Sequence, residues 1–303
     1  MKEINNVLIC GLGAIGCIYA AKIQKFNPDN LKILVDKKRY KNYIKNPLTF
    51  NGEKIQFNYV LPDEKEYKAD LIIIATKNNG LIEAVKNIKN FVHKDTIIIS
   101  LLNGIDSENY IAEYYGKDKI VYSYFIGHSA FRNGRQISQD GVYSTVFGTI
   151  DNNVNADILK DYFDKTGIKY QISEDIIYSM WLKFALNISA NQVSAILHLT
   201  FGEMLKNKEC MELFKNIITE VQSIAIAENI KNADRLIEDA MSALNKMSPD
   251  GKTSMLQDIE AKRKTEVDIF AGKIIELGQK HNIPTPYNTC LYNMIKIIEK
   301  TMA

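Results

Sequence analysis

Residues 7–16 read Val-Leu-Ile-Cys-Gly-Leu-Gly-Ala-Ile-Gly, and this stretch decides the fold of the first half of the chain. A short apolar run leads into three spaced glycines, and a helical pattern follows directly. Gly11 allows a tight turn after the strand, Gly13 allows backbone N–H groups to approach a phosphate, and Gly16 allows the helix to pack closely on the strand. The helix N-terminus presents its unpaired N–H groups and its positive dipole end to an anion. The stretch therefore predicts a dinucleotide-binding loop formed by Gly11, Leu12, Gly13, Ala14, Ile15 and Gly16.

A carboxylate stands where such a fold places its ribose ligand. Asp36 ends the next apolar run and lies 20 residues beyond Gly16. The run Lys37-Lys38-Arg39-Tyr40-Lys41 follows it. This run is either a solvated helix start or a cradle for a 2′-phosphate in which Arg39 contacts the cofactor, whereas the Asp36 carboxylate favours a bare ribose hydroxyl. The residues alone leave NADP and NAD both open.

Two further apolar runs predict buried parallel strands. Residues 69–76 and 96–102 are mostly apolar and rich in β-branched side chains. Lys77 and Asn103 follow these runs directly. Because ligands bind outside the carboxyl ends of the strands in open α/β sheets, we predict that both residues contact the cofactor.

The first half continues this alternation, and the second half is helical. Strand patterns lie at 120–125, 142–148 and 168–172, and helical patterns lie at 155–166, 174–200, 208–229, 233–247, 254–281 and 287–302. The predicted fold is α/β, with an N-terminal Rossmann-type doubly wound sheet over residues 1–172 and an all-helical C-terminal domain over residues 173–303.

Composition narrows the class of partner. A net charge of +2 with 24% charged residues gives no basis for expecting nucleic acid or a membrane surface. The four cysteines show no metal-ligand spacing, so we expect reduced thiols and no metal. No apolar run reaches the ~18 residues of a membrane helix, and the start of the chain leaves no room for a signal peptide. We expect a cytoplasmic protein with a small-molecule ligand, whose C-terminal helices pack on one another or on a second copy in a homodimer.

One predicted helix is apolar almost all the way round, which marks it as buried. Its apolar side chains are Ile176, Ile177, Met180, Trp181, Leu182, Phe184, Leu186, Ile188, Val193, Ile196 and Leu197. Lys183, Asn187 and Asn191 recur within it every fourth residue, so they drift only ~80° and share one face. Unpaired buried amides cost roughly 1–3 kcal/mol each. This polar stripe therefore faces a polar cavity, a ligand or a partner charge, unless Lys183 reaches the surface and the asparagines bond to backbone.

A second polar stretch spans residues 251–266. Thr253 or Ser254 can cap a helix there, and the charged residues from 258 onward can form a solvated face. Spacing alone does not distinguish Ser254 or Glu266 from their neighbours.

Together these segments resemble the ketopantoate reductase (2-dehydropantoate 2-reductase) family. The resemblance runs from residue 8 to the C-terminal helices. Its most specific part is Ser254-Met255-Leu256-Gln257-Asp258 through Arg263-x-Thr265-Glu266. The other matching motifs are Gly11-Leu12-Gly13-Ala14-Ile15-Gly16, Lys77, Asn103-Gly104, Trp181-x-Lys183-x-x-x-Asn187-x-x-x-Asn191 and Gly202-Glu203.

The resemblance implies a reductase of a small 2-keto acid, with NADP(H) favoured as cofactor and NAD(H) as the alternative. It implies that Lys183 is the general acid and that Glu266 binds the substrate hydroxyl and lies near the cofactor. It assigns the substrate to Asn187, Asn191 and Ser254, the cofactor to Lys77, and both to Asn103. Hydride transfer to a ketone develops negative charge on its oxygen, which an ammonium can stabilise and protonate.

Two positions depart from the family pattern, and three other interpretations compete with it. Phe201 and Gly251 stand where substrate-side asparagines are expected. A different 2-keto acid is one alternative. A β-hydroxyacid dehydrogenase is another, although those enzymes carry a glycine-rich run before the lysine, where this chain has residues 178–182, Tyr-Ser-Met-Trp-Leu. The third is a sensor that binds a dinucleotide without turnover, which would have no use for Lys183 and Glu266.

Overall fold

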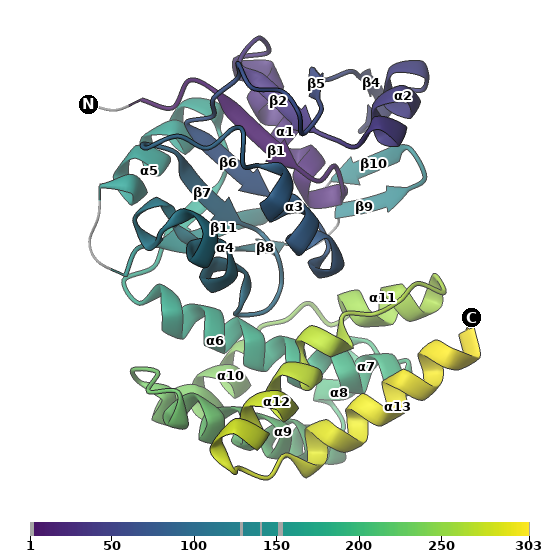
Figure 1. The fold of residues 1–303 in the computed structure, drawn as a ribbon. Coiled ribbons are helices and arrows are strands. Elements are labelled where there is room, and N and C mark those ends of the chain that lie inside the picture. The colour runs from purple at the N-terminus through teal and green to yellow at the C-terminus, as the bar shows by residue number, and fades with distance from the viewer. Residues whose placement is uncertain (1–2, 128–129, 140, 151–153, 303) are drawn as a thin grey trace. The chain divides into compact units, whose positions relative to one another are not determined.

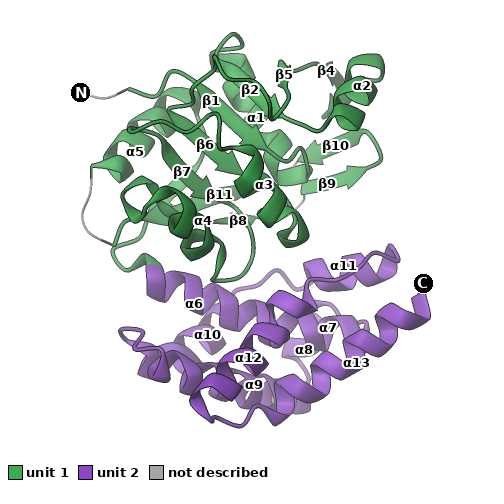
Figure 2. Cartoon of the chain, viewed as in Figure 1, with its two compact units in different colours: residues 1–176 green, residues 177–303 purple. Residues whose placement is uncertain are grey.

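The computed structural model describes residues 3–127, 130–139, 141–150 and 154–302 (Figure 1). The chain divides into two compact units, residues 1–176 and 177–303 (Figure 2). The sequence placed the division between residues 172 and 173, whereas the units meet in the first turn of the helix that begins at Ile176.

Unit 1 is built on a five-stranded parallel sheet in the order β5-β2-β1-β6-β7. The strands are β1 (Val7–Cys10), β2 (Leu31–Leu34), β5 (Tyr59–Val60), β6 (Leu71–Ile74) and β7 (Ile97–Ser100). Val7 of β1 lies opposite Leu31 on one side and Leu71 on the other. Every residue of β1 is buried, as expected of a central strand covered on both faces.

Helices cover both faces of this sheet. Val7 and Ile9 belong to a core shared with α1 (Ala14–Phe26) and α5 (Asn155–Thr166), while Leu8 and Cys10 are buried on the opposite face. Figure 1 shows α3 (Leu81–Asn87) and α4 (Ser107–Tyr115) in front of the sheet. Shorter helices complete the connections: α2 (Lys37–Lys45), η1 (Asn78–Gly80) and η2 (Lys117–Lys119). The doubly wound architecture predicted from the sequence is confirmed.

Two smaller sheets extend unit 1. One contains β4 (Glu53–Ile55), β3 (Leu48–Phe50), β10 (Gln136–Gln139) and β9 (Ala130–Asn133) in that order, and the other contains β12 (Tyr170–Ile172), β11 (Tyr143–Gly148) and β8 (Tyr122–Gly127). The β9–β10 hairpin was not predicted, because Ile137 is its one fully buried apolar side chain and no alternating pattern results. This hairpin packs on α1 and brings a distant part of the chain beside the glycine loop (Figure 1).

Unit 2 is all-helical, as predicted. Its elements are α6 (Ile176–Leu186), η3 (Asn187–Asn191), α7 (Gln192–Leu197), α8 (Phe201–Leu205), α9 (Lys208–Ala227), η4 (Ala233–Arg235), α10 (Leu236–Leu244), α11 (Ser254–Glu260), η5 (Val267–Ile269), α12 (Ala271–His281) and α13 (Pro286–Met302). The long helix α9 packs against α10, α12 and α13. Its buried Glu220 accepts hydrogen bonds from the backbone N–H groups of Tyr287 and Asn288, which satisfies the start of α13. No helix in the described part of the chain is long and apolar enough to span a membrane.

The continuous helix predicted over 254–281 was wrong. The chain turns after α11 because Lys262 adopts a left-handed conformation with φ +51°. The N–H of Arg263 donates to the carbonyl of Asp258 over 2.7 Å, and that of Lys262 donates to Ile259 over 2.9 Å. This is the Schellman ending that helices usually make with glycine. A lysine at that position left no stop signal in the sequence.

The helix predicted over 174–200 is present but shorter and irregular. It begins at Ile176, passes through the π-helical turn η3 and ends where His198 adopts φ +56°. Leu197 was expected to be buried but is 50% exposed, because the chain turns at the next residue. Helix α8 follows as a separate element.

Candidate active site

The predicted cofactor residues of unit 1 lie at one edge of its parallel sheet. Each of them follows one strand: Asp36 follows β2, the loop 11–16 follows β1, Lys77 follows β6 and Asn103 follows β7. These four strands are neighbours in that order. Because these strands are parallel, their carboxyl ends share an edge. The chain moves from β1 to β2 on one side and returns to β6 on the other, so the glycine loop lies where the strand order reverses. Open α/β sheets bind ligands at this point.

Each glycine of the loop occupies its position for a different physical reason. Gly11 has φ +102°, and a Cβ there would lie 2.6 Å from the carbonyl oxygen of Ala75. A Cβ on Gly16 would overlap the carbonyl oxygen of Gly11. Gly13 is the N-cap of α1, and a Cβ on it would meet nothing within 4 Å. Two glycines are therefore required by the fold, whereas the third leaves open space beside the helix N-terminus, where a ligand can approach the unpaired N–H groups.

Asp36 and Arg39 pair with each other. Oδ1 of Asp36 accepts the backbone N–H of Arg39 over 2.7 Å and caps α2, and Oδ2 lies 3.2 Å from the Arg39 guanidinium. The basic run after Asp36 forms the exposed first turns of α2. Arg39 therefore has the Asp36 carboxylate as its counterion in an exposed ion pair.

The carboxyl end of β6 contributes a residue that sequence reasoning missed. Thr76 lies against Gly11, and its hydroxyl is buried without a hydrogen-bond partner in the described part of the chain. The exposed Lys77 follows and begins η1, and Asn103 is half-buried beyond β7. An unsatisfied buried hydroxyl is costly, so its position beside the loop fits a polar ligand. The position of Thr76 at the end of an apolar run was the sequence signal that could have identified it.

A second missed residue comes from the β9–β10 hairpin. The guanidinium of Arg132 donates to the carbonyl oxygen of Leu12 in the glycine loop. It also donates to the carbonyl of Gly134 over 2.9 Å and reaches the Tyr43 hydroxyl at 3.4 Å. No local sequence signal indicates this contact, because Arg132 and Leu12 are 120 positions apart.

In unit 2 the polar stripe runs through the irregular part of the predicted helix. Lys183 lies in the last turn of α6, and Asn187 and Asn191 are the first and last residues of η3. A π turn bonds residue i to i+5, so each residue advances by less than in an α-helix. This reduced advance opposes the drift expected along an ideal helix and keeps the three side chains on one face. The hydroxyl of Ser189 in η3 donates to the carbonyl of Ala185 in α6 over 2.9 Å.

Burial differs along the stripe. Lys183 and Asn187 are half-buried, whereas Asn191 is only 5% exposed. The Nδ2 atom of Asn191 is buried and has no hydrogen-bond partner among the described residues. This nitrogen therefore does not donate to any backbone carbonyl in the described part of the chain, whereas one interpretation of the stripe required such a bond. A buried amide donor without an acceptor is the feature expected where a ligand completes the site.

The hydroxyls at the start of α11 have different surroundings. Thr253 is the N-cap, and its Oγ1 accepts the N–H of Leu256 over 3.2 Å. Ser254 is the first helical residue and is exposed. Thr253 is therefore the residue that caps the helix, and the Ser254 hydroxyl is not needed for capping. Helix α11 packs against α7 and η3, which carry the end of the polar stripe.

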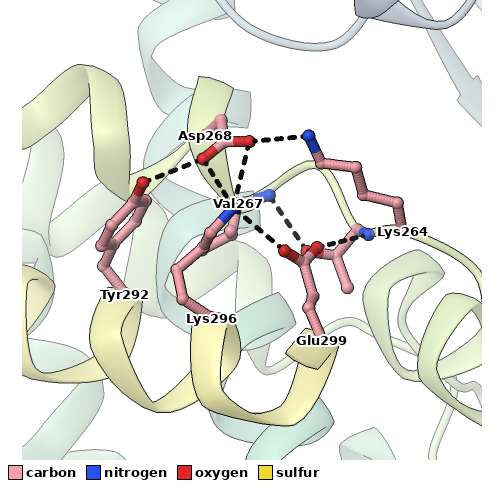
Figure 3. Close-up of polar contacts among 7 residues, drawn as sticks. Lys264, Val267, Asp268, Tyr292, Lys296 and Glu299 are labelled. Carbon is pink, nitrogen blue, oxygen red and sulfur yellow. Dashed lines mark hydrogen bonds and ion pairs between the residues drawn. The ribbon is translucent and has the colours of Figure 1, made fainter. Parts of the chain in front are cut away.

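The segment that carries Glu266 is held on both sides by packing and by α13 (Figure 3). Glu299 accepts hydrogen bonds from both the N–H and the hydroxyl of Thr265, each over 2.7 Å. On the other side, Val267 is fully buried. Lys296 lies 3.1 Å from Glu299 and completes this anchor. The half-buried Glu266 therefore projects from a backbone with little freedom to move.

A cluster of paired charges surrounds this anchor. Asp268 accepts the Tyr292 hydroxyl over 2.9 Å and forms ion pairs with Lys296 and Lys264 at 3.2 and 3.4 Å (Figure 3). Burial opposes ionisation of Glu299, but the hydrogen bonds from Thr265 and the charge of Lys296 outweigh it and lower the pKa of that carboxyl. Within the charged run of 258–266, residues 260–264 are exposed as a solvated face requires, whereas Asp258 and Thr265 are buried.

The two departures from the family pattern lie against each other. The N–H of Phe201 donates to the carbonyl of Gly251 over 3.0 Å, and a Cβ on Gly251 would lie 3.2 Å from the Phe201 ring. The aromatic ring therefore uses space that a side chain at residue 251 would need. Gly251 lies three residues before Ser254 in the sequence, so an apolar ring stands close to this segment where two polar amides were expected.

A Rossmann-type unit and a helical unit with a lysine–asparagine stripe define a two-domain oxidoreductase. Residues 7–152 match the ketopantoate reductase PanE/ApbA family, and residues 175–299 match the C-terminal domain of ketopantoate reductase PanE/ApbA. The chain belongs to this family.

Similar proteins agree with that assignment. A 2-dehydropantoate 2-reductase from Streptococcus pyogenes serotype M6 is 28% identical over 305 residues, which cover 98% of each chain. A 2-dehydropantoate 2-reductase from Pyrococcus horikoshii is 30% identical over 240 residues, covering 77% of this chain and 76% of its own. A solved structure of D-mandelate dehydrogenase with NADH and anilino(oxo)acetate is 25% identical, with a TM-score of 0.85 and coverage of 98% and 99%.

Proposed function

We propose that the protein reduces 2-dehydropantoate to (R)-pantoate with NADPH, a step that supplies pantothenate synthesis. The buried, unpartnered amide of Asn191 on the same face as Lys183 is the observation that supports this proposal most directly. Family membership and the curated 2-dehydropantoate 2-reductases of similar length support the choice of substrate.

The residues of unit 1 fit a nicotinamide dinucleotide. The open space at Gly13 admits the pyrophosphate to the N-terminus of α1, and the unsatisfied Thr76 hydroxyl offers a further polar contact. Asp36 would bind the adenosine ribose, and Lys77 and Asn103 would lie along the cofactor from the same sheet edge. When bound, the reduced nicotinamide supplies the hydride.

Lys183 is the proposed general acid. A hydride that adds to the substrate carbonyl carbon leaves a negative charge on the carbonyl oxygen. The Lys183 ammonium stabilises this charge and transfers a proton to the oxygen, so that the ketone becomes an alcohol. Asn187 and Asn191 share its face and would orient the keto acid, and the Ser254 hydroxyl would donate to it. Glu266 would accept a hydrogen bond from a substrate hydroxyl.

The test is a steady-state assay of ketopantoate reduction with Lys183→Ala. We expect loss of at least about a hundredfold in kcat, the usual scale of general acid catalysis, with dinucleotide affinity retained. Lys215→Ala removes an exposed lysine of α9 and serves as the control. Reduction by Lys183→Ala at the parent rate would exclude the proposed acid. Dinucleotide binding by the parent without turnover of any 2-keto acid would favour the sensor.

A second candidate is reduction of a 2-keto acid with an apolar or aromatic side chain by NADH. The Phe201–Gly251 contact favours it, because an aromatic ring replaces polar groups beside the start of α11. Asp36 favours NADH, because a carboxylate repels a 2′-phosphate. The similar D-mandelate dehydrogenase structure contains NADH and anilino(oxo)acetate, a small acid with an aromatic ring. Parallel kcat/KM measurements with ketopantoate and phenylglyoxylate, each with NADPH and NADH, decide between the two candidates.

A further inference from the structure

Arg132 contacts the glycine loop from outside the Rossmann motif. The hairpin β9–β10 packs on α1, and its half-buried guanidinium bonds the carbonyl oxygen of Leu12, directly before Gly13. The Tyr43 hydroxyl and the Gly134 carbonyl hold the other nitrogens. The position of the charge is therefore determined by three acceptors on three different segments.

The charge of Arg132 is not neutralised by the described residues. Its three acceptors are two carbonyls and a phenol, and no carboxylate in the described part of the chain forms an ion pair with it. Arg39, the arginine that the sequence indicated, is instead paired with Asp36 at 3.2 Å. A half-buried charge without a counterion is unfavourable by itself and attracts an anion.

The field of this guanidinium reaches the first turn of α1. Burial raises the pKa of the Cys17 thiol to about 12, and the charge of Arg132 opposes that rise because it favours the thiolate. Cys17 donates its backbone N–H to Gly13 at the start of the same helix. The helix dipole and the arginine thus act on the same region with the same sign.

We infer that Arg132 binds a phosphate group of the dinucleotide beside the glycine loop. This inference rests on the proposed cofactor site and adds to it a cation from a different sheet. The phosphate is either the pyrophosphate that NADH and NADPH share or the 2′-phosphate that NADPH alone carries. An arginine fork can bond two oxygens of either group.

The test measures Kd of the intact protein for NADH and for NADPH by fluorescence titration, at low and at high ionic strength. Arg132→Gln removes the charge, and Arg132→Lys keeps it without the fork. Arg135→Gln is the matched control, because Arg135 belongs to the same hairpin and bonds Asn42 instead of the loop. Thermal unfolding of each variant without ligand shows whether the hairpin is intact.

We expect Arg132→Gln to raise Kd about tenfold to a hundredfold, the range for one charge-assisted hydrogen bond. It should also reduce the salt dependence of binding, with Arg132→Lys intermediate and Arg135→Gln unchanged. An equal rise for both dinucleotides identifies the pyrophosphate, and a rise for NADPH alone identifies the 2′-phosphate.

Parent affinity in folded Arg132→Gln overturns the inference while leaving the proposed function intact. The inference is also overturned if Arg132→Gln and Arg132→Lys raise Kd equally and the salt dependence of binding stays unchanged. A parent protein that binds neither dinucleotide overturns the proposed function as well.

Discussion

Replacing Asn191 by leucine should stabilise the protein and impair its activity. The Nδ2 donor of Asn191 is buried without an acceptor, and such a group costs roughly 1–3 kcal/mol relative to its solvated state. Leucine has a similar branched shape and no polar atoms, so Asn191→Leu removes this cost with little change of packing. The free energy of unfolding should therefore rise by roughly 1–3 kcal/mol.

The same substitution removes a proposed substrate contact. A hydrogen bond to a charged carboxylate contributes about 1.5–3 kcal/mol, which corresponds to a loss of roughly tenfold to a hundredfold in kcat/KM for the keto acid. Urea unfolding without ligands measures the first effect, and a steady-state assay measures the second. Dinucleotide Kd should stay at the parent value, because Asn191 belongs to unit 2 and the glycine loop to unit 1.

Ser189→Ala is the matched control for this experiment. Ser189 is buried in the same π turn, but its hydroxyl already bonds the carbonyl of Ala185 over 2.9 Å. Its replacement should lower stability by about 1 kcal/mol and leave kcat/KM near the parent value. A destabilised Asn191→Leu protein would show that the amide has a structural partner. A stabilised variant with full activity would refute the role in substrate binding.

Three other perturbations test separate parts of the structure. Gly13→Ala should fold with parent stability and bind dinucleotide more weakly, whereas Gly16→Ala should lower the melting temperature, because its Cβ overlaps backbone. Thr265→Val should lower kcat for ketopantoate without changing dinucleotide Kd, because it frees the segment that carries Glu266, and Thr265→Ser should restore activity. Stability should be constant near neutral pH and fall below about pH 4.5. The folded pKa of Glu299 lies below its unfolded value, so protonation of this carboxylate in acid removes its stabilising contribution. Melting temperatures of the parent and of Glu299→Gln, measured from pH 7 to 3, check the sign.

The sequence by itself determined the elements with strong local patterns. The glycine loop, the parallel strands and the change to an all-helical second half follow from spacing and hydrophobic periodicity, which each segment carries within itself. Ordered parallel strands also determine that Asp36, Lys77 and Asn103 share an edge, because the carboxyl ends of neighbouring parallel strands coincide.

Only the tertiary structure decided which side chains are already satisfied. The Thr76 hydroxyl and the Asn191 amide nitrogen are buried and have no hydrogen-bond partner among the described residues. Arg132 meets the glycine loop across 120 positions. Hydrogen-bond satisfaction depends on atoms from distant segments and on burial, so no local pattern contains it. A ligand site is defined by the polar groups that the fold leaves unsatisfied, and these can be identified only after the chain has packed.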